Sequence, residues 1–339
     1  MSGYLCPACR SAVIRQDPGW HCAACARVYP ILFGIADFRL APDRYLSLAE
    51  ERAKAARLHD FAQDHTFDQT LAEYYRLTDD VPPDMARRFA DYVRAGVARG
   101  QGVLDRLGPG EAPLLDAGCG AGGLVVAAAR AGQQVTGLDI ALRWLVIAQK
   151  RLAEAGLTAE LICADIAAPP LPAASFSRIA ASDLFEHLPD PARGAQSLRR
   201  LARPGARLFV ASANRFTLAR YPLAGLWGVG FLPLRLRRAY VIRRRGLDTL
   251  RHAAPTAPGH LARLLRAAGF ARIRALPLAL PAGRQEEGSG LQRAALLVYK
   301  RLRTLPCARD VMTLIGPAFE LTAVAAEPAA AGTDPPPRP

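Results

Sequence analysis

The chain has 339 residues, 51% of them hydrophobic and 22% charged, a composition that excludes a collagen-like, low-complexity or other fibrous protein. Arginine and lysine exceed the acidic residues to give a net charge of +14, which favours anionic partners such as nucleic acid, phosphates or acidic lipid. The N-terminus lacks the pattern of a secretory signal, and the longest weakly polar run, at 221–234, is too broken by proline and glycine to span a bilayer. We therefore expect a cytoplasmic protein with no transmembrane segment.

Two cysteine pairs stand near the N-terminus, each with two residues between its members. They are Cys6 with Cys9 and Cys22 with Cys25. At this spacing two such pairs can close a tetrahedral thiolate site, for which zinc is the expected metal. A segment this short cannot bury enough apolar surface to fold alone, so the metal would supply the missing stability. We predict a zinc ribbon over residues 1–40, with these four cysteines as ligands of a structural zinc.

The stretch RVYPILFGIADFR, which follows the second pair, resembles the zinc ribbon of the tRNA-methyltransferase activator family. Members of that family support methyltransferases, either as separate partners or fused to them. The resemblance implies a role in structural docking and in presenting the substrate. A zinc held by four thiolates has no open coordination position, so the ribbon is not expected to carry chemistry.

Two segments with the apolar spacing of amphipathic helices follow, at 45–61 and 85–107. Pro82 and Pro83 separate them, and the sequence GPGEAP ends the second. We expect residues 41–110 to form a helical linker or lid.

From Leu114 onward, short apolar strands alternate with helical segments. The predicted strands are 114–117, 134–139, 159–165, 177–182, 207–212, 271–280 and 318–326, and the predicted helices are 123–132, 142–156, 192–202 and 259–270. Such alternation is typical of a parallel sheet with helices on both faces. We expect an α/β fold, with a doubly wound, seven-stranded, mostly parallel Rossmann-like sheet over 111–326. An insertion is expected at about 214–255, and the Pro/Ala-rich residues 327–339 are expected to be a disordered tail.

A glycine-rich loop joins the first predicted strand to its helix. Gly118, Gly120 and Gly123 form a G-x-G-x-x-G pattern, and Asp139 ends the next strand, where it can take the ribose hydroxyls of a nucleotide. The pattern alone fits both NAD and S-adenosylmethionine. Charge separates them, because the pyrophosphate of NAD is an anion whereas S-adenosylmethionine presents an ammonium and a sulfonium. Asp116, just before the loop, therefore favours S-adenosylmethionine.

The motifs DAGCGAGG, GLDI, CADIAAPPLPAASFSRI, DLFEHLPDP and LARPGARLFVAS follow one another between about Leu114 and Asn214. In this order they resemble the class I S-adenosylmethionine-dependent methyltransferases, which implies the cofactor and the reaction. Ala206 departs from the family's usual glycine in the turn before the fifth strand, which affects a turn and not cofactor binding. The loop would cradle the methionine end, and Asp165 with Ile166 would border the adenine. The residues expected to bind the cofactor are Asp116, Gly118, Cys119, Gly120, Gly122, Asp139, Ile140, Asp165, Ile166 and Ser182.

Asp183, Glu186 and His187 follow the fourth predicted strand, where the methyl group and its acceptor would meet. In one interpretation this stretch starts a helix and packs the site, and His187 or Glu186 is the general base. In the other, as in a minority of class I methyltransferases that includes ubiquinone-pathway O-methyltransferases and small-RNA 2′-O-methyltransferases, the three side chains bind a divalent cation. The cation would lower the pKa of an acceptor hydroxyl and would need a fourth ligand, such as His252 or His260.

The predicted insertion places Trp227 and Phe231 in an apolar stretch, followed by seven arginines between Arg235 and Arg251. One interpretation is a lid helix with solvated arginines. Others are contact with an amphiphilic anionic substrate or a membrane surface, or with nucleic acid through phosphates and base stacking.

The function predicted from the sequence is S-adenosylmethionine-dependent methylation of an oxygen on a small or lipid-linked acceptor. Peripheral contact with a membrane would accompany a lipid-linked acceptor. An RNA acceptor is an alternative, because a zinc module and excess positive charge also describe rRNA and tRNA methyltransferases. A non-catalytic, methyltransferase-like scaffold that binds a partner through the zinc ribbon is an alternative from another class.

Overall fold

The computed structural model describes residues 3–110, 113–254, 256–279 and 290–327, so all but the first residue of the predicted tail lies outside the described residues. The strands are β1 (Ile14–Gln16), β2 (Gly19–His21), β3 (Val28–Leu32), β4 (Ile35–Asp37), β5 (Leu114–Ala117), β6 (Val135–Asp139), β7 (Glu160–Cys163), β8 (Phe176–Ser182), β9 (Ala202–Ala213), β10 (Phe270–Pro277) and β11 (Ala318–Ala325). The helices are α1 (Leu48–Asp64), α2 (Phe67–Arg76), α3 (Pro83–Arg94), α4 (Gly96–Leu107), α5 (Gly123–Arg130), α6 (Leu142–Glu154), α7 (Pro191–Leu201), α8 (Leu234–Arg245), α9 (Pro258–Ala267), α10 (Gly290–Leu302) and α11 (Pro306–Ile315), with the 3-10 turns η1 (Phe185–His187) and η2 (Val229–Phe231).

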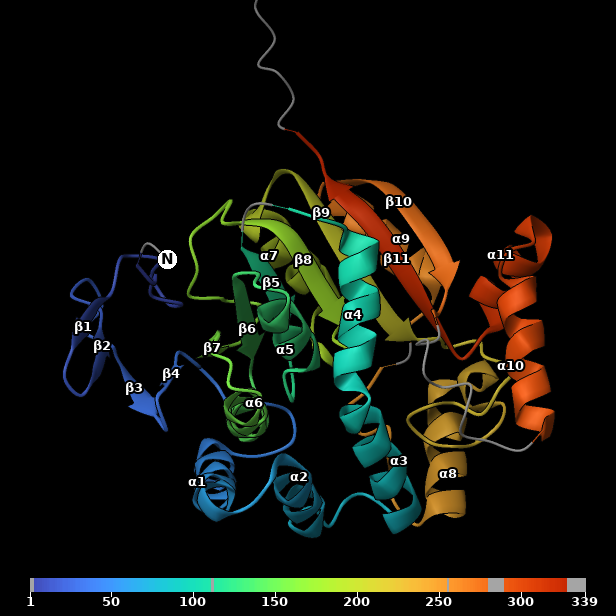
Figure 1. The fold of residues 1–339 in the computed structure, drawn as a ribbon, viewed down its shortest axis with the longest axis horizontal. Coiled ribbons are helices and arrows are strands. Elements are labelled where there is room, and N and C mark those ends of the chain that lie inside the picture. The colour runs from blue at the N-terminus through green and yellow to red at the C-terminus, as the bar shows by residue number, and fades with distance from the viewer. Residues whose placement is uncertain (1–2, 111–112, 255, 280–289, 328–339) are drawn as a thin grey trace, which may run out of the picture.

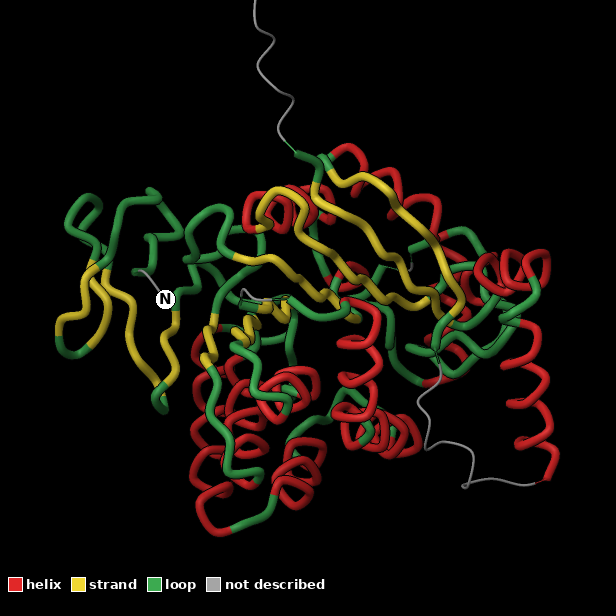
Figure 2. The backbone as a smooth tube through the Cα atoms, turned by 45° about the horizontal axis from the view of Figure 1, so that its top comes forward, coloured by secondary structure: helices red, strands yellow, loops and turns green. Residues whose placement is uncertain are grey.

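The strands form one sheet in the order β1-β2-β3-β4-β7-β6-β5-β8-β9-β11-β10. The strands from β7 to β9 are parallel, and β11 and β10 continue the sheet in antiparallel fashion. Parallel neighbours need crossover connections, which α5, α6 and α7 supply. Helices consequently cover both faces of the sheet, as Figures 1 and 2 show. The predicted Rossmann-like α/β core is confirmed, with all seven predicted strands in it.

The predicted number of seven strands is wrong, because the described residues contribute eleven strands to the sheet. β4 pairs in parallel with β7, with Ala36 opposite Ile162 and Asp37 opposite Cys163. β3, β2 and β1 follow as antiparallel neighbours, at the left of the view in Figure 1. The N-terminal strands therefore extend an edge that β7 would otherwise form. A strand as short as the three residues of β4 has too little periodicity to be recognised from sequence.

Polar contacts fix the N-terminal segment against the core beside β7. Arg10 donates to the carbonyl oxygens of Pro169 and Leu171 at 2.6 and 2.8 Å. Tyr4 donates its hydroxyl to the Glu160 carboxylate at 2.6 Å. The four-cysteine segment is thus an extension of the core sheet.

Residues 41–110 form four helices, whereas the sequence pattern predicts two. The additional helix α2 is short, with a capping box at Thr66 and a buried face that includes Phe67 and Leu71. The single helix expected at 85–107 is divided into α3 and α4, because the backbone leaves helical geometry at Ala95.

α4 packs against the start of α5 so closely that glycine is required on both helices. A Cβ on Gly100 would lie 2.7 Å from Leu124 Cα, and one on Gly123 would lie 2.6 Å from the carbonyl carbon of Gly96. Gly96 and Gly100 are four residues apart and therefore share one face of α4. This face covers the point where the glycine loop enters α5.

Two insertions leave the sheet on the side where the parallel strands have their carboxyl ends. The first begins after β9 and carries η2 and α8, and its ends meet in a parallel bridge between Asn214 and Thr256. The second, α10 with α11, joins β10 to β11 and is not predicted from the sequence. β11 is antiparallel to both of its neighbours, with Ala318 opposite Ala213 and Phe319 opposite Pro277. Both insertions therefore emerge at the edge where the parallel strands end.

We expect Gly100→Ala to lower the free energy of unfolding by about 1–2 kcal/mol. Overpacking against the α5 backbone costs about 1–3 kcal/mol, and the higher helix propensity of alanine offsets up to about 1 kcal/mol of that. Gly102 is the matched control, because a Cβ there would meet nothing within 4 Å. Gly102→Ala should therefore stabilise the protein by about 0.5–1 kcal/mol. Urea unfolding measures both, and equal effects would contradict the packing argument.

Candidate functional site

The carboxyl ends of β5 and β8 lie side by side at the point where the strand order reverses. Ligands of open α/β sheets bind at such a switch point. Two cavities of about 310 and 230 Å³ open there, and Gly118, Asp139, Trp144 and Asp183 line both. They are two parts of one site.

The structure brings the predicted cofactor-binding residues together around these cavities. The first cavity is lined by Asp116, Cys119, Gly120 and Ser182, the second by Ile140, Asp165 and Ile166, and both by Gly118 and Asp139. Gly122 is the exception, because it lies behind the loop, where a Cβ would be 2.9 Å from the Ala148 Cβ. Its role is to turn the chain into α5.

The glycine loop has left-handed backbone at Gly118, Gly120 and Gly122, with φ of +74°, +49° and +69°. Residues other than glycine rarely adopt this backbone conformation, which explains why these three positions are glycines. A Cβ on Gly120 would meet nothing within 4 Å, so this position borders open space. The loop therefore presents bare backbone to the first cavity.

Two carboxylates lie beside the loop. Asp139 accepts from the backbone N–H groups of Gly120 and Ala141, both at 2.8 Å, and burial raises its pKa. Asp116 is 4% exposed, and burial followed by the charge of Asp139 raises its pKa to about 7. Both influences on Asp116 disfavour its ionised form, so a cation in the first cavity would relieve them.

The second cavity combines an apolar wall with charged residues, among them Asp165. Leu138, Ala164 and Ile166 are buried hydrophobic residues that line it. The Asp165 carboxylate accepts from the Ala167 backbone N–H at 2.8 Å, which fixes the position of the side chain. A flat apolar ring with an amino group at its edge fits such a lining.

A pair of side chains from α3 and α4 covers the first cavity. The Tyr92 hydroxyl donates to Asp183, and the Arg99 guanidinium lies 3.4 Å from the centroid of the Tyr92 ring. Arg151, from α6, donates to the carbonyl oxygens of Val93 and Arg94 at 3.1 and 2.8 Å and so holds the end of α3 in place. Tyr92 and Arg99 are absent from the sequence prediction, which treats this segment only as a linker or lid.

Glu186 and His187 have different surroundings. Glu186 is 1% exposed and accepts from the Ser212 hydroxyl at 2.8 Å and from the Ala213 N–H at 3.2 Å. Burial raises the pKa of Glu186 to about 8, and the charge of Asp183 adds to this. His187 lines the second cavity, where its Nδ1 lies 2.8 Å from the Tyr45 hydroxyl. Burial lowers the pKa of His187, so the ring is neutral near pH 7.

A third cavity, of about 320 Å³, adjoins the second at Tyr45 and His187. Its apolar lining comes from the start of α3 and from the first insertion: Val81, Pro82, Met85, Phe89, Leu223 and Leu247. The polar residues Asp80, Asp248, Thr249, Arg251 and His252 complete it. Tyr45 is a site residue that sequence reasoning misses, because nothing in its local pattern marks it.

The predicted cation ligands do not converge in the part of the chain that the structure describes. The carboxylate of Glu186 faces β9, while Asp183 accepts from Tyr92 and His187 contacts Tyr45. The His252 ring lies 4.6 Å from that of Tyr45, whereas His260 lines a separate cavity. This arrangement favours the interpretation in which the segment packs the site and supplies a base.

The four N-terminal cysteines do converge. Their sulfur atoms all lie within 4.8 Å of one another, with Cys6 Sγ 3.5 Å from Cys25 Sγ and Cys9 Sγ 3.4 Å from Cys22 Sγ. These distances exceed that of a disulfide, about 2.05 Å, and bracket the sulfur separation of about 3.8 Å in a tetrahedral zinc–thiolate site. Among the described residues, these four cysteines are the only group of three or more His, Cys, Asp or Glu side chains close enough together to hold a metal ion.

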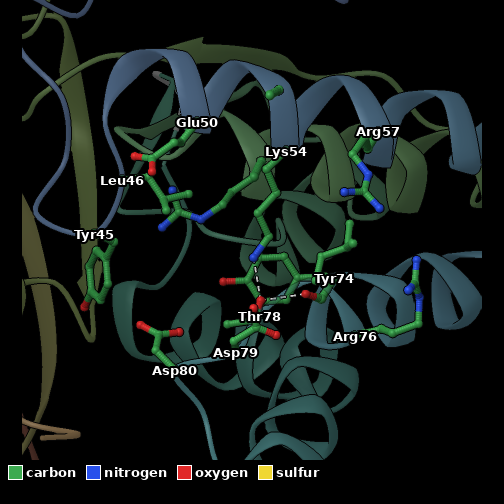
Figure 3. Close-up of a pocket in the computed structure, with 13 residues that line it drawn as sticks. Tyr45, Leu46, Glu50, Lys54, Arg57, Tyr74, Arg76, Thr78, Asp79 and Asp80 are labelled. Atoms are coloured by element: carbon green, nitrogen blue, oxygen red, sulfur yellow. Dashed lines mark hydrogen bonds between the residues drawn. The ribbon is translucent and has the colours of Figure 1, made fainter.

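A further cavity, of about 530 Å³, lies between α1 and α2 (Figure 3) and shares Tyr45 and Arg143 with the second cavity. Lys54 donates to the Thr78 hydroxyl and lies 4.3 Å from the centroid of the Tyr74 ring. Burial, followed by the charge of Arg143, lowers the pKa of Lys54 to about 8. Other lining charges are of both signs, namely Arg57, Arg76, Glu50, Asp79 and Asp80. The cavity therefore has no bias of charge that would select an ion.

Residues 115–210 match the family model described as "Methyltransferase domain". The match confirms the type of domain expected between Leu114 and Asn214. The ubiquinone biosynthesis O-methyltransferase of Paracidovorax citrulli is 38% identical over 118 residues, which cover 34% of this chain and 49% of the relative. The enzyme of the same name from Xylella fastidiosa strain 9a5c is 35% identical over 163 residues, 47% of this chain and 61% of the relative. The chain thus spans about half to three-fifths of the length of these relatives.

Similar solved structures include the Haemonchus contortus phosphoethanolamine N-methyltransferase 2 in complex with S-adenosyl-L-methionine. It is 17% identical, with a TM-score of 0.46 over 68% of this chain and 52% of that chain. A SAM-dependent methyltransferase from Aquifex aeolicus is also 17% identical, with a TM-score of 0.45 over 73% of this chain and 100% of that chain.

The raised pKa of Asp116 predicts a pH-dependent stability. The ordinary aspartate pKa is about 3.9, so the stabilising effect of the protonated side chain is complete below that pH and is lost as the pH rises through about 7. Relative to Asp116→Asn, we expect the free energy of unfolding of the native protein to fall by roughly 2 kcal/mol between pH 5 and pH 7. Urea unfolding over a pH series measures this. The exposed control Asp105→Asn should follow the native curve, and parallel curves for native protein and Asp116→Asn would contradict the assignment.

Proposed function

We propose that this protein is an S-adenosylmethionine-dependent methyltransferase that methylates an oxygen of a small or lipid-linked acceptor. The observation that carries the proposal is the buried Asp116 beside the positive-φ glycine loop. Burial and the charge of Asp139 both disfavour the ionised form of Asp116. A cationic ligand would stabilise that form, whereas the negative charge of a pyrophosphate would disfavour it further. The methyltransferase-domain match over residues 115–210 supports the same conclusion.

The two joined cavities fit the parts of this cofactor. The first offers bare loop backbone and Asp116 to a charged amino-acid end, and the second offers apolar walls and Asp165 to an adenine. Asp139 lines both cavities, which suits the ribose between them. When bound, the cofactor supplies an electrophilic methyl group on a sulfonium.

We assign the acceptor to the third cavity and the general base to His187. The ring is neutral near pH 7 and contacts Tyr45 at the junction of the second and third cavities, so it can take a proton from an acceptor hydroxyl there. Glu186 is instead a positioning residue, because its carboxylate is engaged with Ser212 and Ala213.

The apolar lining from Met85, Phe89 and Leu223 favours an acceptor with a hydrophobic part. The name shared by the two relatives, ubiquinone biosynthesis O-methyltransferase, supports an oxygen acceptor that is lipid-linked. An RNA acceptor is a second candidate on the strength of the net charge of +14. The partly apolar lining of the third cavity favours the smaller acceptor.

We also propose that Cys6, Cys9, Cys22 and Cys25 bind one structural zinc. The proximity of their sulfur atoms supports this, and the docked position of the segment supports a role in holding the sheet edge. A set of four thiolates would leave the metal closed to substrate.

Calorimetric titration tests the cofactor, and we expect binding of S-adenosylmethionine but not of NADH. Absence of S-adenosylmethionine binding would favour the scaffold alternative, and NADH binding would contradict the charge argument.

With labelled cofactor and a total lipid extract as acceptor, we expect His187→Gln to lower the rate by roughly 10²–10⁴-fold while cofactor affinity is retained. His260→Gln is the matched control and should leave the rate unchanged. Activity that falls steeply as the salt concentration is raised, or transfer of the labelled methyl group into RNA, would favour the RNA acceptor.

For the cysteine site we expect one zinc per chain by elemental analysis, with metal lost in Cys6→Ser and in Cys22→Ser. Cys307→Ser is the control, since this exposed cysteine lies outside the cluster and should keep full zinc content. Unchanged zinc in both cluster variants would refute the assignment.

A further inference from the structure

The second insertion exposes a set of large hydrophobic side chains. They are Leu297, Val298, Leu302, Leu305, Val311 and Leu314, each at least 37% exposed, and we call this set the α10–α11 flank. Figures 1 and 2 show α10 at the extreme of the molecule opposite the N-terminal strands, standing away from the sheet. Single exposed leucines are ordinary on a protein surface, whereas a contiguous group marks a contact site.

The spacing and charge of this segment are those of an interfacial helix. Val298 and Leu302 are four residues apart and Val311 and Leu314 three apart, so each pair shares one face of its helix. The charges along the flank are mostly positive, at Lys300, Arg301, Arg303 and Arg309, and the single acid between Leu297 and Leu314, Asp310, pairs with Arg309 at 3.3 Å. An excess of basic over acidic residues beside apolar side chains suits a surface of apolar chains beneath negative headgroups.

The apolar surface continues onto the first insertion. The Leu218 N–H donates to the Ile315 carbonyl at 2.9 Å, and the Asn214 side chain donates to the Leu314 carbonyl at 2.8 Å. Next to these contacts, Phe216 and Phe231 are exposed, with ring centroids 5.7 Å apart. The two insertions therefore form one surface at the edge of the sheet that also carries the cavities.

We propose that the α10–α11 flank docks this protein on an anionic lipid surface. Among the described helices, none has the length and apolar content needed to cross a bilayer. The exposed side chains of the flank are aliphatic, which suits acyl chains better than the stacking surfaces of nucleic-acid bases. The excess of basic side chains over the single acid, Asp310, favours negative headgroups over a second copy of the same surface. The inference rests on this surface alone and does not require the proposed reaction.

Co-sedimentation tests the proposal, with vesicles of phosphatidylcholine alone and of phosphatidylcholine mixed with phosphatidylglycerol. We expect binding to the anionic vesicles that weakens as salt is added. Lys300→Gln with Arg301→Gln should weaken it roughly five-fold per residue. Val298→Ser with Leu302→Ser should weaken it roughly ten-fold or more per side chain, because each substitution removes the apolar burial of that side chain. Ile14→Ser with Val28→Ser is the matched control, since both residues are exposed on the N-terminal strands.

Each other outcome overturns the proposal. Vesicle binding that is absent at low salt, or that the control pair weakens equally, would remove the flank as a lipid contact. A dimer in analytical ultracentrifugation that Val298→Ser with Leu302→Ser abolishes would identify a second copy as the occupant. Binding of tRNA, but not of vesicles, that the charge variant abolishes would identify RNA. Titration of every variant with S-adenosylmethionine verifies folding and tests the proposed function separately, because vesicle binding without cofactor binding would contradict only the latter.

Discussion

Two carboxylates, Asp116 and Asp139, lie largely out of water beside one glycine loop. The free-energy cost of burying their ionised forms is the constraint on which the rest of the site depends. Burial raises the pKa of both Asp116 and Asp139. Asp139 recovers part of the cost from the N–H groups of Gly120 and Ala141, whereas the ionised form of Asp116 would be stabilised by a cationic ligand. Gly96, Gly100 and Gly123, where α4 meets α5, line the same first cavity as Asp116. The helix packing and the buried carboxylate therefore meet at one cavity.

The N-terminal segment is tied to the same site by buried charges. Arg39 pairs with Asp37 at 2.7 Å and also donates to the Ile140 carbonyl at 3.3 Å, on the wall of the second cavity. Arg143 pairs in turn with Asp43 and Glu51. Buried pairs contribute little net stability, but removing one partner costs about 3–5 kcal/mol because a charge is left unpaired. Such pairs favour a single position of the segment, so the cysteine-bearing strands and the second cavity share a fixed geometry.

The sequence predicts those site residues whose position follows from a strand. Asp139 ends β6, Asp165 lies two residues after β7 and the glycines follow β5, so all of them meet where the parallel strands end. Tyr45 and Tyr92 reach the same site from the segment at 41–110, whose periodicity predicts helices but not how they lie on the sheet. The second insertion escapes prediction for a related reason: the strands at 271–280 and 318–326 are recognisable, but the connection between them has no chemical motif.

The segment DLFEHLPDP shows that a structural and a catalytic interpretation need not exclude each other. Glu186 accepts from Ser212 and Ala213 at the end of β9, and its own carbonyl accepts from Ala254 at 2.6 Å, where the first insertion returns. These contacts fix η1 between the sheet and the insertion. His187, the next residue, is thereby held against Tyr45 at the junction of the two cavities. In the proposed mechanism Glu186, held by these contacts, would therefore set the position of the neutral His187 ring, with no cation shared between the two residues.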